Sequence, residues 1–305
     1  MEQPKDLFEQ YIETIQATQA RINAKGMWKW IHVYEADHNI MLTEMRTDQI
    51  CAMLDSRYST SPATIRNYIL VLRSFFAWMQ NFHMRADNPA EMLSYRNIDY
   101  AAGIKVTYWP NYLMLLNTLN RIWTPDEGLP VYPATVFAWV GIPVKIAGEV
   151  KRKQVDLNRQ VIEVGDQNFS LTDEMTDILQ RYDSFKSARR DNRMTMVRTY
   201  TSDTFLYRSE IQNRTASETS KNPVNAVGVL SAASKVLTTH HLRSTLKYSE
   251  LVKSGWLHRM YLMECEGHEL SDVLEYGKAG LNIPTAYPGD ALLIYQNYKK
   301  AFNLN

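Results

Sequence analysis

The sequence predicts a mostly α-helical protein with a small antiparallel β-sheet, and three observations carry this prediction. Apolar residues recur at helical spacing along most of the chain, most clearly over residues 61–84. Two short β-prone runs, 159–164 and 168–171, are separated by a Gly-Asp-Gln-Asn turn, which is typical of a hairpin. Helical spacing then resumes beyond residue 223, so the order is helices, a small sheet and helices again.

The first part of the chain is expected to be entirely helical. An apolar stripe predicts a helix over residues 4–24, and residues 27–40 continue as a second helix or a passage from loop to helix. A short helix begins at Thr47, where Thr47 or Asp48 supplies the capping side chain.

The clearest helix of the chain follows. Ser61 before Pro62 is a cap and first-turn signal. The helix must stop near Asn88-Pro89, because proline cannot continue it. We therefore expect residues 1–95 to form a small helical domain and the polar segment 96–108 to be a linker.

The second expected domain, residues 109–305, contains the sheet and further helices. Before residue 223, the helical segments expected in chain order are 110–122, 134–142 and 172–182. A basic polar loop over 186–202 and a short strand over 205–209 follow. Everything after Pro223 is expected to be helical, with breaks around Gly255, Gly267 and residues 277–288.

Composition excludes several classes of protein. Hydrophobic residues make up 45% and charged residues 22% of 305 residues, as in soluble globular proteins. No apolar stretch is long enough to span a bilayer, and the polar, acidic N-terminus is unlike a signal peptide. Two cysteines, Cys51 and Cys265, do not make a disulfide framework or a thiol-rich metal site. We expect a cytoplasmic protein with no metal.

Charge distribution is more informative than the formal net charge of +1. Two windows concentrate the cations of the second domain. They contain Lys145, Lys151, Arg152, Lys153 and Arg159, and then Lys186, Arg189, Arg190, Arg193, Arg198, Arg208 and Arg214. Such windows are either solvated faces or phosphate-binding surfaces, and other features must decide between these interpretations.

Two stretches of sequence supply those features. Residues 63–93 read ATIRNYILVLRSFFAWMQNFHMRADNPAEML, a long aromatic-rich helix that runs into an Asn-Pro-Ala turn. Further along the chain come His240-His241-Leu242-Arg243, Gly255, Gly267-His268 and Tyr276. In order and approximate spacing, this series resembles the H-x-L-R, G, G-H and Y series of the tyrosine recombinase (phage integrase) family. Together with the hairpin between them, the two stretches cover most of the chain.

The resemblance implies an N-terminal core-binding domain and a C-terminal catalytic-type domain. It also implies DNA strand breakage without a cofactor: a tyrosine attacks a phosphodiester, forms a 3′-phosphotyrosyl bond and frees a 5′-hydroxyl. Arginine forks clamp the non-bridging oxygens and histidines support the phosphate. Carried over to this sequence, Arg243 is the second clamp arginine, His240 its partner, His268 the later histidine and Tyr276 the nucleophile.

Tyrosine spacing leaves alternatives open. Tyr276 falls eight residues after His268, one fewer than is common in the family, and no Thr-Thr pair precedes it. Tyr287, Tyr295 and Tyr298 are therefore alternative nucleophiles, although the last two also suit the packing face of a terminal helix.

Two positions depart from the family pattern. Pro143 stands where the first clamp arginine belongs, and proline offers phosphate neither a side-chain nor a backbone donor. Lys145 is the nearest cation and a candidate substitute, with Lys151 or Arg152 as further options. The hairpin turn carries Asp166 in place of the family's lysine. Loss of one clamp costs about a hundredfold to a thousandfold in rate.

The partner expected from the resemblance is double-stranded DNA, in a bacterial, archaeal or phage-encoded setting such as a mobile element. The cations expected to contact it are Lys151, Arg152, Lys153, Arg189, Arg190 and Arg193 in the second domain and Arg66 and Arg73 in the first. Three functions remain open: a site-specific recombinase or integrase, a catalytically inactive DNA-binding relative that acts as a regulator or architectural factor, and a protein-interaction module.

The third function and homo-oligomer formation both depend on the C-terminal helix. Apolar residues recur there at helical spacing, namely Leu292, Leu293, Tyr295, Tyr298 and Phe302. This face either docks onto a neighbouring subunit, giving a dimer or tetramer on DNA, or packs against its own chain.

Overall fold

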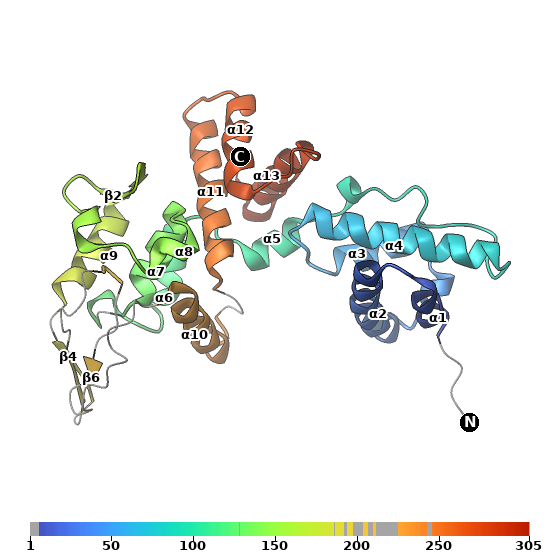
Figure 1. The fold of residues 1–305 in the computed structure, drawn as a ribbon, viewed down its shortest axis with the longest axis horizontal. Helices are drawn as coiled ribbons and strands as arrows, with labels where there is room; N and C mark the ends of the chain where they lie inside the picture. The colour runs from blue at the N-terminus through green and yellow to red at the C-terminus, as the bar shows by residue number, and fades with distance from the viewer. Residues whose placement is uncertain are drawn as a thin grey trace. The chain divides into compact units, whose positions relative to one another are not determined.

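The computed structural model describes residues 6–127, 129–185, 187–191, 194–197, 204–206, 210–211, 225–242 and 246–304. Within these residues the chain forms thirteen α-helices and two small antiparallel sheets (Figure 1). The mostly α-helical fold with a small antiparallel sheet is therefore confirmed. The chain divides into two compact units, Met1–Val106 with Leu292–Asn305, and Thr107–Ala291. They are called unit 1 and unit 2 below.

Unit 1 begins with two helices where one was expected over residues 4–24. Helix α1 (Leu7–Thr14) ends because Ile15 adopts an extended conformation with ψ 115, and α2 (Thr18–His38) starts three residues later. Asp6 caps α1 by accepting from the amide of Phe8. The passage expected at 27–40 is the continuation of α2, which ends at the left-handed residue Asn39.

Helix α3 (Thr47–Asp55) begins at Thr47 as expected, but its N-cap is Arg46, whose backbone amide donates to the side chain of Gln49. Helix α4 (Pro62–Asn81) begins where Ser61 and Pro62 predicted, and the Ser61 hydroxyl accepts from the amide of Thr64. The buried face of α4 carries Pro62, Ile65, Ile69, Leu72, Phe75, Phe76 and Met79. This face forms much of the core of unit 1.

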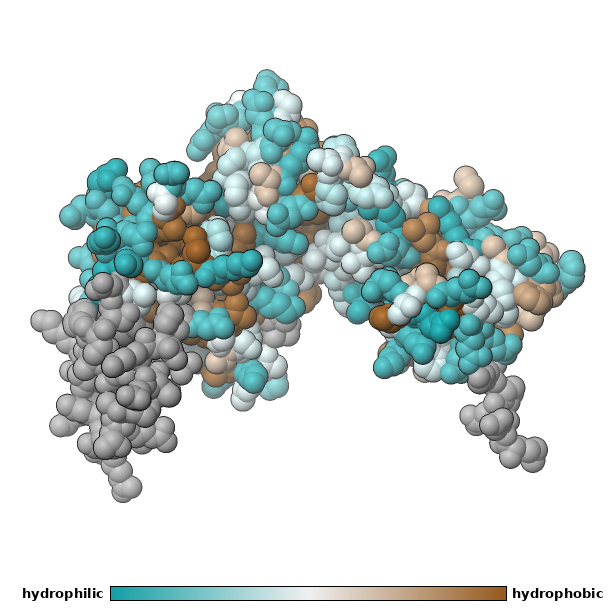
Figure 2. Space-filling view, in the orientation of Figure 1, coloured by the Kyte–Doolittle hydropathy of each residue, from teal (hydrophilic) through white to brown (hydrophobic). Residues whose placement is uncertain are grey.

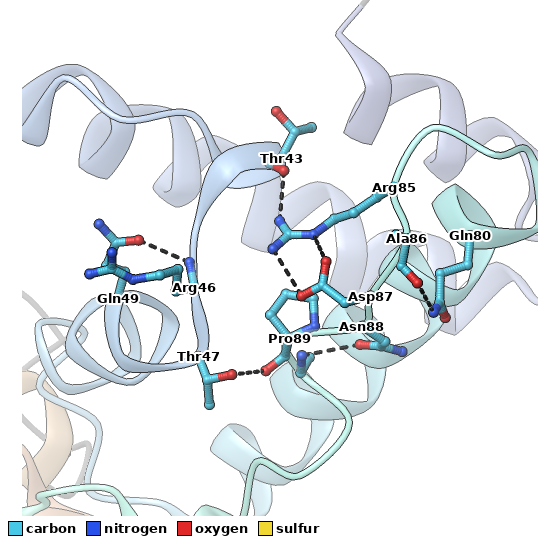
Figure 3. Close-up of polar contacts among 11 residues, drawn as sticks. Thr43, Arg46, Thr47, Gln49, Gln80, Arg85, Ala86, Asp87, Asn88 and Pro89 are labelled. Carbon is cyan, nitrogen blue, oxygen red and sulfur yellow. Dashed lines mark hydrogen bonds and ion pairs between the residues drawn. The ribbon is translucent and has the colours of Figure 1, made fainter.

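The turn after α4 is fixed to the start of α3 by hydrogen bonds between residues distant in sequence (Figure 3). Arg85 donates to the carbonyl of Thr43 at 2.7 Å and pairs with Asp87 at 2.8 Å. The Thr47 hydroxyl donates to the carbonyl of Pro89 at 2.8 Å. The Asn-Pro-Ala turn is therefore a structural joint between two helices of unit 1.

The segment expected to be a linker is part of the folded unit. It contains a 3₁₀ turn (Tyr95–Asn97) and α5 (Ala101–Thr107), and Tyr100 is fully buried. A Cβ at Gly103 would lie 2.4 Å from the carbonyl oxygen of Tyr58, so this segment packs too closely for any larger residue. Buried packing of this kind is incompatible with a linker.

Helix α13 (Gly289–Phe302) completes unit 1, although the second domain was expected to run to residue 305. Asn297 accepts from the amide of Tyr100 at 3.2 Å, and Lys300 pairs with Asp99 at 2.8 Å. The Lys300 ammonium holds the pKa of Asp99 below its usual value. The apolar face of α13 therefore packs within its own chain, and docking onto a neighbouring subunit is not supported.

Unit 2 is built around a helix that is buried on all sides, α7 (Val131–Val140). Because every residue of α7 is buried, neighbouring helices must cover it completely. The other helices of this unit are α6 (Tyr112–Leu119), α8 (Val144–Ala147), α9 (Asp173–Ser184), α10 (Ala226–Thr239), α11 (Tyr248–Cys265) and α12 (Leu270–Leu281). Helices α9, α10 and α11 each pack against α7, and their apolar residues contribute to the core of unit 2.

Two three-stranded antiparallel sheets lie in unit 2. The first has the order β1 (Val155–Asp156), β2 (Val161–Val164) and β3 (Gln167–Ser170), and its hairpin turn is the two-residue Gly165-Asp166. The second consists of β4 (Ser187–Asp191), β5 (Met194–Val197) and β6 (Glu210–Ile211). The prediction of a loop over 186–202 is wrong for the residues of β4 and β5, which pair as antiparallel strands. In the expected strand over 205–209, Phe205 and Leu206 form a bend beside an isolated bridge between Thr204 and Lys151.

The break expected around Gly255 does not occur, whereas the break expected over 277–288 does, at residues 282–288 between α12 and α13. Gly255 lies inside α11 and Gly277 inside α12, and both are buried against other side chains or backbone. Gly267 does separate the two helices, with φ +87. A glycine in a helical pattern can therefore indicate close packing instead of a break.

None of the helices in the described part of the chain is both long enough and apolar enough to cross a lipid bilayer. On the face drawn in Figure 2, polar residues surround separate hydrophobic areas.

Candidate functional site

The candidate site begins where α11 crosses α7 inside unit 2. A Cβ at Gly255 would lie 2.0 Å from the carbonyl oxygen of Trp139, so the two helix backbones are in direct contact. Trp139 occupies the last turn of α7, where backbone carbonyls lack partners within the helix. A donor from outside α7 is therefore needed at this carbonyl.

Arg259, one helical turn after Gly255 on α11, supplies that donor. Its Nη1 donates to the Trp139 carbonyl at 3.0 Å, and its Nε donates to the hydroxyl of Tyr276 on α12 at 2.9 Å. Its guanidinium carbon lies 4.9 Å from the centre of the Trp256 ring. Tyr276 packs on the same ring, with 4.5 Å between ring centres. Three helices thus fix both the tyrosine and the arginine.

Gly280 explains how Trp256 reaches this position. Gly280 lies on the same face of α12 as Tyr276, and a Cβ there would lie 1.8 Å from the Trp256 ring. The absence of a side chain at position 280 therefore leaves the space that the indole fills.

A cavity of about 900 Å³ lies beside this junction. Gly141 and Pro143 line it at the end of α7, and other walls come from α10, the start of α11 and the end of α12. Its hydrogen-bonding and charged lining residues are Ser231, Ser234, Lys235, Thr238, Lys247, Tyr248, Ser249, Lys253 and Asn282. These described lining residues include three lysines and no carboxylate. The charged groups of this described lining are therefore all cationic.

The three lysines differ in their partners. Lys247 pairs with Glu250 at 3.0 Å. Lys235 and Lys253 have no ion-pair partner among the residues that the structure describes. Tyr248, another lining residue, donates its hydroxyl to the carbonyl of Ile142 at 2.7 Å, and burial raises the pKa of this phenol. Tyr248 is therefore a neutral structural residue of the wall.

The histidines of the motif series lie at helix ends. His240 is the exposed C-cap of α10, and His241 follows it with φ 55. The side chain of His268 is 50% exposed and lies 3.7 Å from the carboxylate of Glu266. Neither His240 nor His268 hydrogen-bonds to Tyr276 within the described residues, and Arg243 lies outside them. The shared site of His240, Arg243, His268 and Tyr276 therefore stays a prediction.

The expected replacements for the first clamp arginine can also be located. Pro143 is the N-cap of α8, while Lys145 is exposed and does not line the cavity. Arg152 binds the carboxylate of Asp183 and lies over the ring of Phe205 at 5.9 Å, so it is held in a structural contact. Arg259, which no sequence motif singled out, is the arginine that hydrogen-bonds to Tyr276.

The alternative nucleophiles can be compared by exposure. Tyr295 and Tyr298 are 1% and 0% exposed in unit 1, which places their hydroxyls out of reach of a phosphodiester. Tyr287 is 41% exposed in the loop before α13. Tyr276 is partly buried, and its hydroxyl accepts from the guanidinium of Arg259.

Several cations expected to contact DNA have other roles. Arg73 donates to the carbonyl of Ala90 at 3.1 Å and so holds the Asn-Pro-Ala turn. Arg66 lies over the ring of Tyr95 at 4.4 Å. These two arginines are therefore fixed to the body of unit 1.

The remaining expected DNA contacts lie in unit 2. Lys151 and Lys153 are exposed beside β1, where they can reach solvent. Arg189 and Arg190 lie in β4, whose backbone alone is described. Arg193 lies outside the described residues.

One group in unit 1 has the composition of a metal site. The donor atoms of Asp6, His32 and Glu35 lie within 4.8 Å of one another. Each ring nitrogen of His32 already faces a carboxylate, at 2.9 Å for Glu35 and 3.3 Å for Asp6. Glu35 also accepts from the amide of Leu42 at 2.6 Å. The group therefore functions as a hydrogen-bonded connection between α1, α2 and the turn after α2.

No protein-family model and no curated protein matches this chain. Among solved structures, the chain is similar to one described as the crystal structure of XerA recombinase. The two share 11% identity with a TM-score of 0.39, over 97% of this chain and 95% of that one. A likeness of this size does not carry a functional conclusion. The function proposed below therefore rests on the motif series and on the geometry of unit 2.

Proposed function

We propose that this protein binds double-stranded DNA and breaks and rejoins it through Tyr276, in the manner of tyrosine recombinases. The observation that carries the proposal is the Arg259–Tyr276 hydrogen bond beside a cavity whose described lining contains three lysines and no carboxylate. A phenol held by a cation next to a cavity with lysines in its wall has the components that attack on a phosphodiester requires. The series His240, Arg243, Gly255, His268 and Tyr276 supports the same reaction.

The proposed reaction is a transesterification that needs no oxidant or energy source. The Tyr276 oxygen attacks phosphorus, the bond from phosphorus to the 5′ oxygen breaks, and a 3′-phosphotyrosyl bond forms. The phenol proton is balanced by the proton gained on the departing 5′-hydroxyl. Attack by a second 5′-hydroxyl reverses these changes and rejoins the strand.

A trapping experiment tests strand breakage. Labelled duplexes that tile the DNA flanking the gene, each nicked so that the freed fragment diffuses away, are incubated with the protein and run on a denaturing gel. We expect a covalent adduct that Tyr276→Phe abolishes. Tyr287→Phe is the matched control, because Tyr287 is the exposed alternative and its adduct yield should equal that of wild type.

A second candidate function is DNA binding without cleavage. It is favoured by Pro143 in the cavity wall and by Asp166 in the hairpin turn, where the family would carry an arginine and a lysine. This alternative predicts duplex binding that Tyr276→Phe does not change, with no adduct from any duplex. Absence of an adduct together with intact binding would replace the first function with the second.

A further inference from the structure

Arg259 is held on three sides and retains unused donors. A guanidinium has five N–H groups in one plane. In Arg259, Nε donates to the Tyr276 hydroxyl, Nη1 donates to the Trp139 carbonyl, and the guanidinium carbon lies over the Trp256 ring. Its Nη2 donates to no residue in the described part of the chain. The remaining donors are therefore available in a fixed direction.

The charge of Arg259 is also unbalanced in its surroundings. Its side chain is partly buried, and no carboxylate among the described residues pairs with it. A cation removed from water without a counter-ion is costly, and contact with an indole ring offsets this cost in part. An anionic ligand would neutralise the positive charge of Arg259.

Arg259 is not itself a lining residue of the cavity, but it is a neighbour of Gly141, which is. The backbone of Gly141 lines the cavity and has φ 94. A Cβ at this glycine would lie 3.6 Å from Nη2 of Arg259 and 3.4 Å from the Trp256 indole nitrogen. Arg259 therefore adjoins the cavity wall at the residue that leads into Pro143.

We infer that Arg259 is the phosphate-binding and positioning arginine of this site. Its Nη2 holds a non-bridging oxygen of a DNA phosphodiester, while its Nε fixes the Tyr276 oxygen beside the same phosphorus. The inference rests on the proposed function and deepens it, because it assigns a guanidinium where Pro143 supplies none. It differs from the expectation that Lys145, Lys151 or Arg152 fills this role.

The first test separates rate from binding in the trapping assay. Arg259→Gln should lower the rate of adduct formation by about a hundredfold to a thousandfold. Duplex affinity should change less, by about threefold, because most binding comes from other phosphates. Arg259→Lys should recover part of the rate, since lysine keeps the charge but loses the planar fork. Added guanidinium ion should restore Arg259→Gln, and sodium ion at the same concentration should not.

A matched control and a fold control accompany these variants. Arg181→Gln removes an arginine on α9 that pairs with Asp177 at 2.9 Å, and its adduct rate should equal that of wild type. Thermal unfolding identifies any variant whose loss comes from misfolding, in which case Arg259→Lys carries the test. Equal rates in wild type and in both Arg259 variants would overturn the inference.

The second test needs no turnover. Inorganic phosphate is titrated into the full-length protein labelled with ¹⁵N at arginine Nε, and the Arg259 resonance is followed by NMR. We expect this resonance to shift with phosphate, in wild type and equally in Tyr276→Phe. Arg259→Lys identifies the resonance by its disappearance.

The two proposals fail in different ways. If no adduct forms but phosphate shifts the Arg259 resonance, strand breakage is wrong and the phosphate site stands. If an adduct forms at the same rate in wild type and in both Arg259 variants, and phosphate does not shift the Arg259 resonance of wild type, the role of Arg259 is wrong and strand breakage stands. An Arg259 resonance that phosphate does not move, in a protein that forms no adduct, contradicts both.

Discussion

Gly255 shows how one residue sets the geometry of unit 2. A methyl group at this position would overlap the Trp139 carbonyl, which belongs to a fully buried helix and cannot move aside. The same close approach brings Arg259, one turn later, to that carbonyl at 3.0 Å. The packing of α11 on α7 and the position of Arg259 therefore share one cause.

This leads to a prediction with an internal control. Gly255→Ala should lower the free energy of unfolding by about 3 kcal/mol, because overlap with backbone forces the two helices apart. Gly26→Ala should raise it by about 0.5–1 kcal/mol, because Gly26 lies inside α2 with nothing within 4 Å of an added Cβ. Urea denaturation measures both. Equal effects of the two substitutions would contradict the close contact.

The stability of unit 2 should depend on pH through His258. Burial, and then the charge of Arg259, lowers the pKa of His258 below its usual value of 6.5. Below a pH of about 6.5 the unfolded chain therefore binds a proton at His258 more readily than the folded protein does. The contribution of His258 to the free energy of unfolding is present above that pH and is lost as the pH falls below it. Between the pKa of His258 in the folded protein and its pKa in the unfolded chain, the free energy of unfolding falls by up to about 1.4 kcal/mol per pH unit.

The measurement is the free energy of unfolding at several pH values from 8 down to about 5, in wild type and in His258→Gln. We expect the difference between the two proteins to shrink as the pH falls, because glutamine does not titrate. A difference that stays constant with pH would show that His258 is not buried in its neutral form.

At the scale of elements, helix α13 is a structural part of unit 1. Tyr298 is 0% exposed, so Tyr298→Ala should lower the free energy of unfolding by about 3–5 kcal/mol. Gln296→Ala, on the exposed face of the same helix, should change it by less than about 0.5 kcal/mol. Denaturant titration compares the two. Gel filtration of wild type should show an elution volume independent of concentration, whereas a concentration-dependent volume would indicate docking between chains.

Helix patterns with strong end signals were predictable. Ser61 and Pro62 placed the start of α4, and Thr172 is the side-chain cap of α9 at the point where a helix was expected. Elements that depend on long-range contacts were not. The break at Ile15 and the pairing of β4 with β5 leave no local signal, and Gly255 was interpreted as a break because its partner is 116 positions away in sequence, at Trp139.

The candidate site was predictable in part. The resemblance pointed to Tyr276 but not to Arg259, because no motif includes that position. The helical period offered one usable signal, since Gly255 and Arg259 are four residues apart and lie on one face of α11. Recognising Gly255 as a contact glycine would have placed Arg259 against α7. Sequence spacing cannot show which candidate tyrosine is buried, because burial depends on tertiary packing. Exposure differs among Tyr276, Tyr287 and Tyr298 for this reason.

At the scale of the whole molecule, DNA binding should depend on salt through the cavity lysines. Lys235→Gln and Lys253→Gln should each reduce the slope of log affinity against log salt by about 0.9, the value for one lost phosphate contact. Lys278→Gln is the control, because Lys278 already pairs with Glu275 on α12 at 2.6 Å. Binding measured by fluorescence anisotropy at several salt concentrations gives the slopes. Identical slopes in all four proteins would remove these lysines from the interface.

The return of the chain to unit 1 at Leu292 has a consequence for synthesis in the cell. Unit 2 is continuous in sequence, so it can fold as soon as it leaves the ribosome. Unit 1 must wait for α13, which is translated after all of unit 2, on the order of ten to forty seconds later. During that interval the surface that receives Tyr295 and Tyr298 is uncovered. The nascent N-terminal helices should therefore be a binding site for chaperones until α13 has left the ribosome.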